Sequence, residues 1–239
     1  IFWSVPVFVL LALWLWLAPT AHTKVSPPQR TMASMTLQGS AQPAQRARVS
    51  ALHLGIMVGA GSLVYFGMNG WIAPYNQAIH HAEITPLALV VLNAAQLPVS
   101  LAVTVMAQQL AGRRSPFIVA GAICAVAIAG WLFTPVVLEP FWAALLGGSA
   151  ALVFTLGIAL PPLLARPQEV ARLSGITVSL TYGVAFVGPL LGGALWDLFH
   201  LPSLAFLPVA FASILLIVLG ALLPARGSFG LMAIRRATP

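Results

Sequence analysis

Charged residues are scarce in this chain. Lys and Arg together number 11 and Asp and Glu number 4, so only 6% of the 239 residues carry a charge, whereas 60% are hydrophobic. Soluble domains carry charge on about 25% of their residues. So few charges cannot cover a water-exposed surface, and the composition excludes a soluble enzyme, a nucleic-acid-binding protein and a disordered chain. The solvent of this protein must be a lipid bilayer.

Cysteine is nearly absent as well. The single cysteine, Cys124, lies inside an apolar run, which excludes a disulfide framework and a thiolate metal site. The five histidines include no pair at a metal-binding spacing along a helix. The apolar runs also lack the clustered carboxylates or histidines of an active site. We therefore expect no metal, no cofactor and no enzymatic activity.

Long apolar runs are what the sequence has instead. A transmembrane helix needs about 20 mostly apolar residues, and charges or Pro and Gly clusters separate seven such runs. They cover residues 1–18, 51–75, 86–110, 116–134, 141–164, 175–196 and 202–223. The sequence thus predicts an all-α integral membrane protein with about seven transmembrane helices.

Connection lengths divide these predicted helices into unequal parts. Residues 1–19 hold one helix, residues 20–50 form a long polar linker, and residues 51–223 hold six helices with short connections, followed by a tail at 224–239. A lone helix ahead of a long linker leads us to expect that the chain begins partway through a longer protein. A secretory signal in the first helix is a less favoured interpretation, because no charged segment precedes it.

The signs of the charges sort the predicted connections into two groups. All eleven basic residues fall on one side, namely Lys24, Arg30, Arg46, Arg48, Arg113, Arg114, Arg166, Arg172, Arg226, Arg235 and Arg236. The connections on the other side hold Glu83, Glu139 and Asp197 and no basic residue. Because Lys and Arg are retained on the cytoplasmic side, we expect a multi-pass protein of the cell's inner (plasma) membrane with a cytoplasmic C-terminus. The basic residues are expected to report this topology and to attract anionic lipid headgroups.

The middle of every predicted helix lacks ionisable residues. Such residues usually mark proton or ion pathways inside a membrane. We expect Glu139 in a loop and Asp197 at a helix end, where it would act in helix termination or gating. Proton translocation would then depend on groups outside this chain.

Neutral polar residues form stripes along two neighbouring predicted helices. Tyr65, Asn69 and Asn76 share one face of the second helix, and Asn93, Gln96, Ser100 and Thr104 share one face of the third. The two stripes either face one aqueous cavity or form interhelical hydrogen bonds that hold the helices together. The hydroxyls of the sixth helix, Ser174, Thr177 and Thr181 on one face and Ser179 and Tyr182 on another, are better explained by packing.

Glycine and proline mark close approaches and breaks. Gly55 with Gly59, and Gly188 with Gly192, are GxxxG pairs that allow helix backbones to touch. Residues 65–75 contain two glycines and a proline beside aromatic and amide side chains. Interrupted transmembrane helices are typical of transporter binding sites, so this segment is predicted to be a broken helix.

The order and motifs of the chain resemble a known family. Six closely connected helices after a long basic linker look like the second half of a major facilitator superfamily transporter, and the lone first helix resembles its sixth. SLVYFGMNGWIAPY (62–75), AGRRSP (111–116), LARPQEVARLSG (164–175) and YGVAFVGPLLGGALWDLF (182–199) are similar to the cyanate and nitroimidazole transporter branch. Gly112, Arg113 and Arg114 match only the end of the superfamily's loop motif, because Gln108 and Gln109 stand where acidic and basic residues would precede it.

The resemblance implies solute transport by alternating access between two six-helix halves, of which the N-terminal half would be missing here. The candidate substrate-binding residues are Asn69, Trp71, Tyr75, Asn93 and Gln96, whose amides and rings suit a small polar or anionic solute. Candidates for gating or helix packing are Gly188, Pro189, Gly192 and Asp197. The alternative is a seven-span receptor-like or other non-transport membrane protein. Its sequence signatures, such as a lysine inside a span for a retinal protein, do not occur.

Overall fold

The computed structural model describes residues 51–110, 113–164 and 169–223, which all belong to one unit of the chain, Gln45–Pro239. The predicted first helix at 1–19, the linker at 20–50 and the tail at 224–239 lie outside the described residues. Within them, all regular structure is helical. The all-α prediction is therefore confirmed for this part of the chain.

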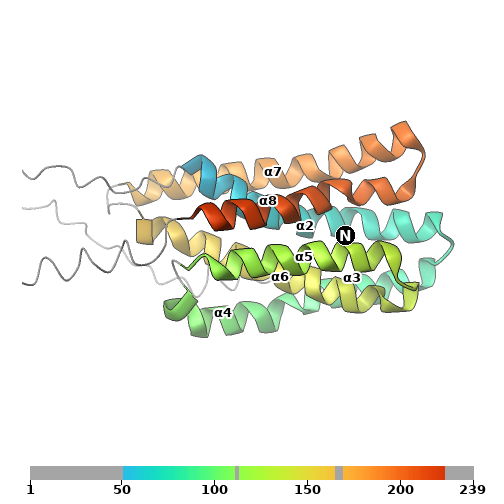
Figure 1. Cartoon of the computed structure of the whole chain (residues 1–239), viewed down its shortest axis with the longest axis horizontal. Coiled ribbons are helices and arrows are strands. Elements are labelled where there is room, and N and C mark those ends of the chain that lie inside the picture. Colours follow the sequence, from blue (N-terminus) through green and yellow to red (C-terminus); the bar gives the residue numbers. More distant parts are fainter. Residues whose placement is uncertain (1–50, 111–112, 165–168, 224–239) are drawn as a thin grey trace, which may run out of the picture. The chain divides into compact units, whose positions relative to one another are not determined.

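The described residues form ten helical elements, whose arrangement Figure 1 shows. The long helices are α2 (Ala51–Ala78), α3 (Thr85–Ala94), α4 (Gln96–Leu110), α5 (Ser115–Phe133), α6 (Glu139–Leu164), α7 (Val170–Phe199) and α8 (Leu207–Leu222). Three 3-10 helices join them: η1 (Ala82–Ile84), η2 (Val136–Leu138) and η3 (Pro202–Phe206). Six segments, with α3 and α4 counted as one, are long and apolar enough to cross a membrane. These features indicate a multi-pass membrane protein.

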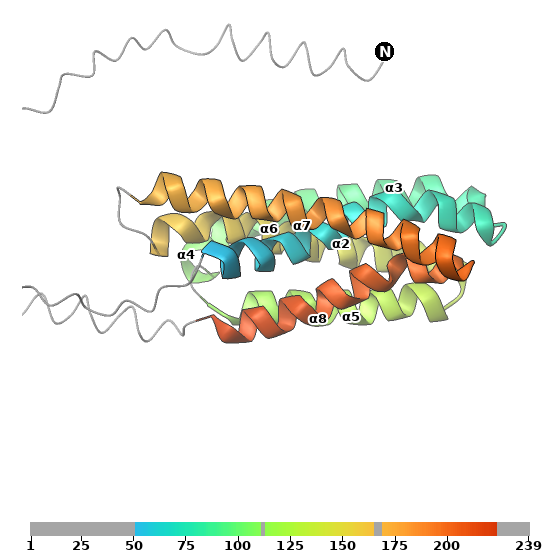
Figure 2. The same cartoon turned by 90° about the horizontal axis from the view of Figure 1, so that it is seen from above.

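The helices lie side by side along one direction (Figures 1 and 2). The connections through η1, η2 and η3 share one end of the bundle, which we call the 3-10 end. Prolines lie in the first turn of several of these elements, as Pro86 does in α3 and Pro208 in α8. Proline fits the first helical turn because its missing N–H would have no partner there.

Helices α2 and α7 run parallel, and each contributes glycines that lie against side chains of the other. A Cβ added at Gly59 of α2 would meet Val184 of α7 at 2.8 Å. Further toward the 3-10 end the roles reverse, because a Cβ added at Gly188 of α7 would collide with Leu63 of α2. Small residues permit such close packing in a bilayer, where lipid is as apolar as the side chains. Both predicted GxxxG pairs therefore lie at one helix contact.

Burial is uneven among the membrane-spanning helices. The most apolar window of α2 is 67% buried, whereas that of the segment Ala82–Met106 is only 11% buried and that of α7 22%. Helix α2 is thus central, and α4 and much of α7 present large apolar side chains on the outside, Leu101, Val105, Phe186 and Leu190 among them. The segment that contains α4 and the helix α7 are therefore the least covered of the six.

The helix break lies elsewhere than the sequence predicts. Helix α2 continues without interruption from Ala51 to Ala78, with Pro74 inside it, so the predicted break at 65–75 is wrong. The break falls at Ala95, between α3 and α4, inside the predicted third helix. Pro98 supplies the physical reason, since it has no N–H to donate to the carbonyl of Ala94 and its ring crowds that carbonyl.

Candidate functional site

Four polar side chains from α2, α3 and α4 form one hydrogen-bonded group. The hydroxyl of Tyr65 donates to Oδ1 of Asn93 at 2.7 Å. Nδ2 of Asn93 donates to Oδ1 of Asn69 at 3.2 Å and to the carbonyl of Leu89 at 2.8 Å. Nε2 of Gln96 reaches the same Asn93 oxygen at 3.5 Å. The two predicted stripes on α2 and on α3 and α4 therefore meet, and we call Tyr65, Asn69, Asn93 and Gln96 the amide network.

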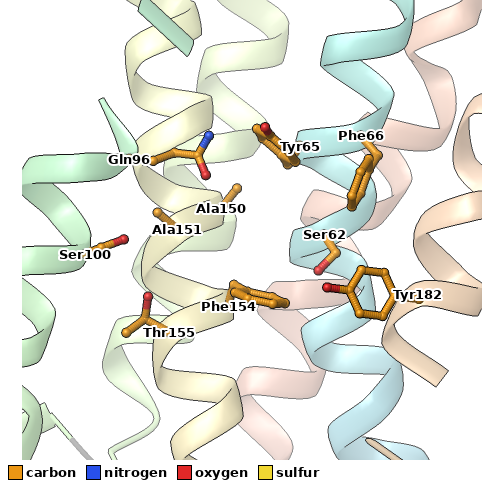
Figure 3. Close-up of a pocket in the computed structure, with 10 residues that line it drawn as sticks. All are labelled: Ser62, Tyr65, Phe66, Gln96, Ser100, Ala150, Ala151, Phe154, Thr155 and Tyr182. Carbon is orange, nitrogen blue, oxygen red and sulfur yellow. The ribbon is translucent and has the colours of Figure 1, made fainter. Parts of the chain in front are cut away.

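A cavity adjoins the amide network at Tyr65 and Gln96 (Figure 3). Its volume is about 210 Å³. Four helices line it, with Ser62, Tyr65 and Phe66 from α2, Gln96 and Ser100 from α4, Ala150, Ala151, Phe154 and Thr155 from α6, and Tyr182 from α7. All of these side chains are uncharged, so this wall can bind a polar solute through hydroxyl, amide and aromatic groups.

Two aromatic residues line the cavity on the side away from the 3-10 end. Figure 3 shows the rings of Phe154 and Tyr182 directed toward each other below Ser62. The same two residues also line a second, smaller hollow of about 20 Å³, which continues beside Val58 of α2 and Thr177 of α7. Phe154 and Tyr182 thus separate two hollows that follow one another along the bundle. We call them the aromatic pair.

Each hollow contains a buried hydroxyl that lacks a hydrogen-bond partner among the described residues. These are Oγ of Ser62 in the larger hollow and Oγ1 of Thr177 in the smaller one. The two residues are 5% and 2% exposed. Buried hydroxyls without partners are uncommon in folded proteins.

The break at Ala95 lies between two residues of the amide network. Asn93 lies on α3 just before the break and Gln96 is the first residue of α4. Helix α3 is held against α6, since a Cβ at Gly147 of α6 would collide with the carbonyl of Leu92. Discontinuous helices are a recurrent way to build transporter sites. Here the discontinuity coincides with the amides rather than with residues 65–75.

The structure places the other candidate binding residues elsewhere. Nε1 of Trp71 donates to the carbonyl of Pro189 at 3.2 Å, and its ring lies 5.5 Å from that of Trp196. Tyr75 is buried and meets the ring of Phe206 edge-on at 5.0 Å. Both side chains therefore pack between helices, outside the lining of the cavity.

The predicted gating or packing residues divide in the same way. Gly188 and Gly192 are buried at the contact between α2 and α7, and a Cβ at Gly192 would meet Nε1 of Trp71 at 2.7 Å. Pro189 lies inside α7 and accepts the Trp71 hydrogen bond. Asp197 is exposed near the end of α7. The first three residues serve helix packing here.

Sequence reasoning missed most of the α6 and α7 wall of the cavity. Tyr182 was expected to pack between helices, yet it is exposed and belongs to the aromatic pair. Thr177 and Thr181 are buried, and Oγ1 of Thr181 donates to the carbonyl of Gly55, so packing explains the other face of α7. Ala150, Ala151 and Phe154 carry no signal that would distinguish a cavity wall from a lipid-facing or core residue.

A second polar contact lies at the 3-10 end. Glu139 is the first residue of α6, and its side chain is buried rather than in a loop, which corrects the sequence prediction. Nδ2 of Asn76, which is 0% exposed, donates to Oε2 of Glu139 at 2.8 Å. The side chain of Asn76 therefore bonds to α6 and does not belong to the amide network.

Histidine, cysteine and carboxylate side chains form no group of three that could hold a metal ion within residues 51–110, 113–164 and 169–223. Comparison with protein-family models, with curated proteins and with solved structures finds no match to this chain. The cavity, the amide network and the helix break are the features that point to a function.

Proposed function

We propose that this chain is the C-terminal half, with one preceding helix, of a major facilitator superfamily transporter of the cyanate and nitroimidazole type. The proposed activity is transport of a small polar or anionic solute by alternating access. The observation that carries the proposal is the cavity beside the amide network at the break between α3 and α4. Broken helices at mid-span and convergent polar groups in a concave, partly apolar site are features of solute-binding sites.

The size and position of the cavity support a site shared with a second half. Its volume of about 210 Å³ is below the roughly 300–1,000 Å³ of complete small-molecule pockets. The exposed apolar faces of α4 and α7 lie beside two of its walls. A facing six-helix half would cover these helices and complete the cavity, with the lipid bilayer around both.

The lining favours hydrogen bonding over ion pairing. Gln96, Ser100 and Thr155 offer amide and hydroxyl donors, and Phe66, Phe154 and Tyr182 offer ring faces. An anion in this half would be bound by N–H and O–H donors, since none of the lining residues carries a positive charge. A small planar polar solute fits both sets of groups.

The proposed orientation follows from the charges. Arg113, Arg114 and Arg172 of the described residues lie at the end opposite the 3-10 end, and Glu83 and Asp197 lie at the 3-10 end. With the basic residues cytoplasmic, the 3-10 end faces outside in the inner (plasma) membrane. The aromatic pair then lies on the cytoplasmic side of the larger hollow, where it would obstruct passage of the solute.

Ligand-induced stabilisation of the detergent-purified 239-residue chain tests the site, with nitrate and 2-nitroimidazole as probes. A ligand at 100 times its Kd stabilises the folded state by about 2.7 kcal/mol. Ser100→Phe fills the cavity and is expected to abolish the stabilisation. Thr104→Phe, one turn along α4 and outside the lining, is the matched control and should retain it. Stabilisation that persists unchanged in Ser100→Phe, or that Thr104→Phe abolishes equally, would contradict the assignment of this cavity as the site.

A further inference from the structure

Glu139 is a buried carboxyl group that forms no ion pair with another described residue. It is 2% exposed at the start of α6, and within 51–110, 113–164 and 169–223 the side chain that donates to it is that of Asn76 of α2. The arginines of the described residues, Arg113, Arg114 and Arg172, lie at the other end of the bundle. Burial of an ionised carboxylate is costly unless it is paired, and binding of a proton removes that cost.

Asn76 can satisfy both protonation states of this carboxyl. In the observed arrangement Nδ2 of Asn76 donates to Oε2 of Glu139, as a carboxylate requires. Oδ1 of Asn76 is buried and has no hydrogen-bond partner among the described residues. Rotation of the amide by half a turn would aim this oxygen at the carboxyl, where it could accept the O–H of the protonated acid. An unpartnered buried acceptor beside a buried carboxyl is explained by this second state.

The titratable groups that interact with Glu139 are Tyr75 of α2 and His81, which follows α2. His81 is partly exposed and its Nδ1 lies 3.0 Å from Oε1 of the exposed Glu83, so the neighbourhood is open to water. Helices α3 and α4 contain no titratable residue, and α5 contributes only Cys124 at its middle. The titratable residues of α7 are Arg172, Tyr182 and the exposed Asp197.

We propose that Glu139 and Asn76 form a proton-binding site at the 3-10 end of the bundle. A hydronium ion from the aqueous phase transfers its proton to the Glu139 carboxylate; one O–H bond breaks in the hydronium ion, one forms on the carboxyl, and a water molecule leaves. Because Asn76 belongs to α2 and Glu139 to α6, proton binding changes a contact between two core helices. The site is independent of the proposed solute and would operate in the chain as it stands.

Infrared titration of the detergent-purified 239-residue chain tests the site directly, because protonated carboxyl groups have a separate C=O stretching band. The chain has only four acidic side chains. As the pH falls from about 9 to about 4, a range that spans ordinary carboxyl titration, the wild type should gain a band that Glu139→Gln lacks. Glu83→Gln, which removes an exposed carboxyl, should retain it. After transfer to D₂O the Glu139 band should shift more slowly than the exposed ones.

Asn76→Ala provides a second measurement that keeps Glu139. Loss of the hydrogen-bond partner should move the Glu139 band to higher frequency and change the pH at which it appears. This variant also serves if Glu139→Gln does not fold. The proposal would be overturned if Glu139→Gln removed no titrating band, if the band were present at every pH, or if Asn76→Ala left its frequency and its titration unchanged.

Discussion

The contact of Gly188 of α7 with Leu63 of α2 predicts how a substitution there changes the free energy of unfolding. A Cβ added at Gly188 would collide with Cγ of Leu63 and would lie 2.9 and 3.0 Å from its two methyl carbons. Carbon atoms prefer a separation of about 3.5–4.0 Å. Leu63 is only 8% exposed and cannot turn away freely. Gly188→Ala must therefore separate the helices or strain Leu63, at a cost of about 1–3 kcal/mol for an overpacked contact.

Gly183→Ala is the matched control for this substitution. Gly183 is on the same helix, five residues earlier, and a Cβ there would meet nothing within 4 Å. Both variants gain the same helix propensity, about 0.8–1.0 kcal/mol. The propensity term cancels when the two are compared, so Gly188→Ala should be less stable than Gly183→Ala by about 1–3 kcal/mol, the overpacking term alone.

Reversible unfolding in mixed micelles, followed by circular dichroism, measures the free energy of unfolding of both variants. Leu63→Ala should then rescue Gly188→Ala, because it removes the atoms that collide; the coupling between the two sites should be about 0.5–3 kcal/mol. Equal stability of Gly188→Ala and Gly183→Ala, or additive effects in the double variant, would refute the packing argument.

Three further predictions concern the site and the topology. Asn93→Ala removes two hydrogen bonds between α2 and α3, each about 0.6 kcal/mol in a membrane, so folded yield should stay near wild type while probe binding to the chain is lost; a collapsed yield with normal binding would instead favour a structural role. Ser228→Cys, with Cys124 replaced by Ala, should react with an impermeant thiol reagent only from the cytoplasmic side. Labelling of intact cells from outside would contradict the predicted cytoplasmic C-terminus. In the complete transporter, Asp197→Asn should leave any pH dependence of uptake in place, because Asp197 is exposed at a helix end; a flat uptake profile beside a sloped wild-type one would assign the proton to Asp197.

The helices were largely predictable, because their signal is cumulative over many residues. Apolar runs bounded by charges and prolines located all six membrane-spanning segments within 51–223. The position of the break was not predictable in the same way. Pro74 and Pro98 both lie inside apolar runs, and only Pro98 ends a helix. The sequence shows that a proline is present, whereas packing against the neighbouring helices determines whether the helix ends there.

The sequence predicts only those residues of the candidate site that are polar within an apolar segment. Asn69, Asn93 and Gln96 stand out in an apolar background, and the structure brings them together. Trp71 and Tyr75 lie in the same part of α2 as Asn69, but on other faces of the helix. Local sequence does not show which of these faces meets a cavity and which meets a neighbouring helix. Helical periodicity identifies a shared face without saying what that face meets.

If α4 turned as a rigid helix about the break at Ala95, its two ends would move by very unequal distances. At 1.5 Å per residue, the 15 residues of α4 extend about 22 Å. A rotation of about 10° at the break would displace the far end by about 4 Å, Ser100 by about 1 Å and Gln96 by a fraction of an ångström. Such a rotation would widen the arginine-bearing end of the bundle, while the amides beside Ala95 would keep their hydrogen bonds.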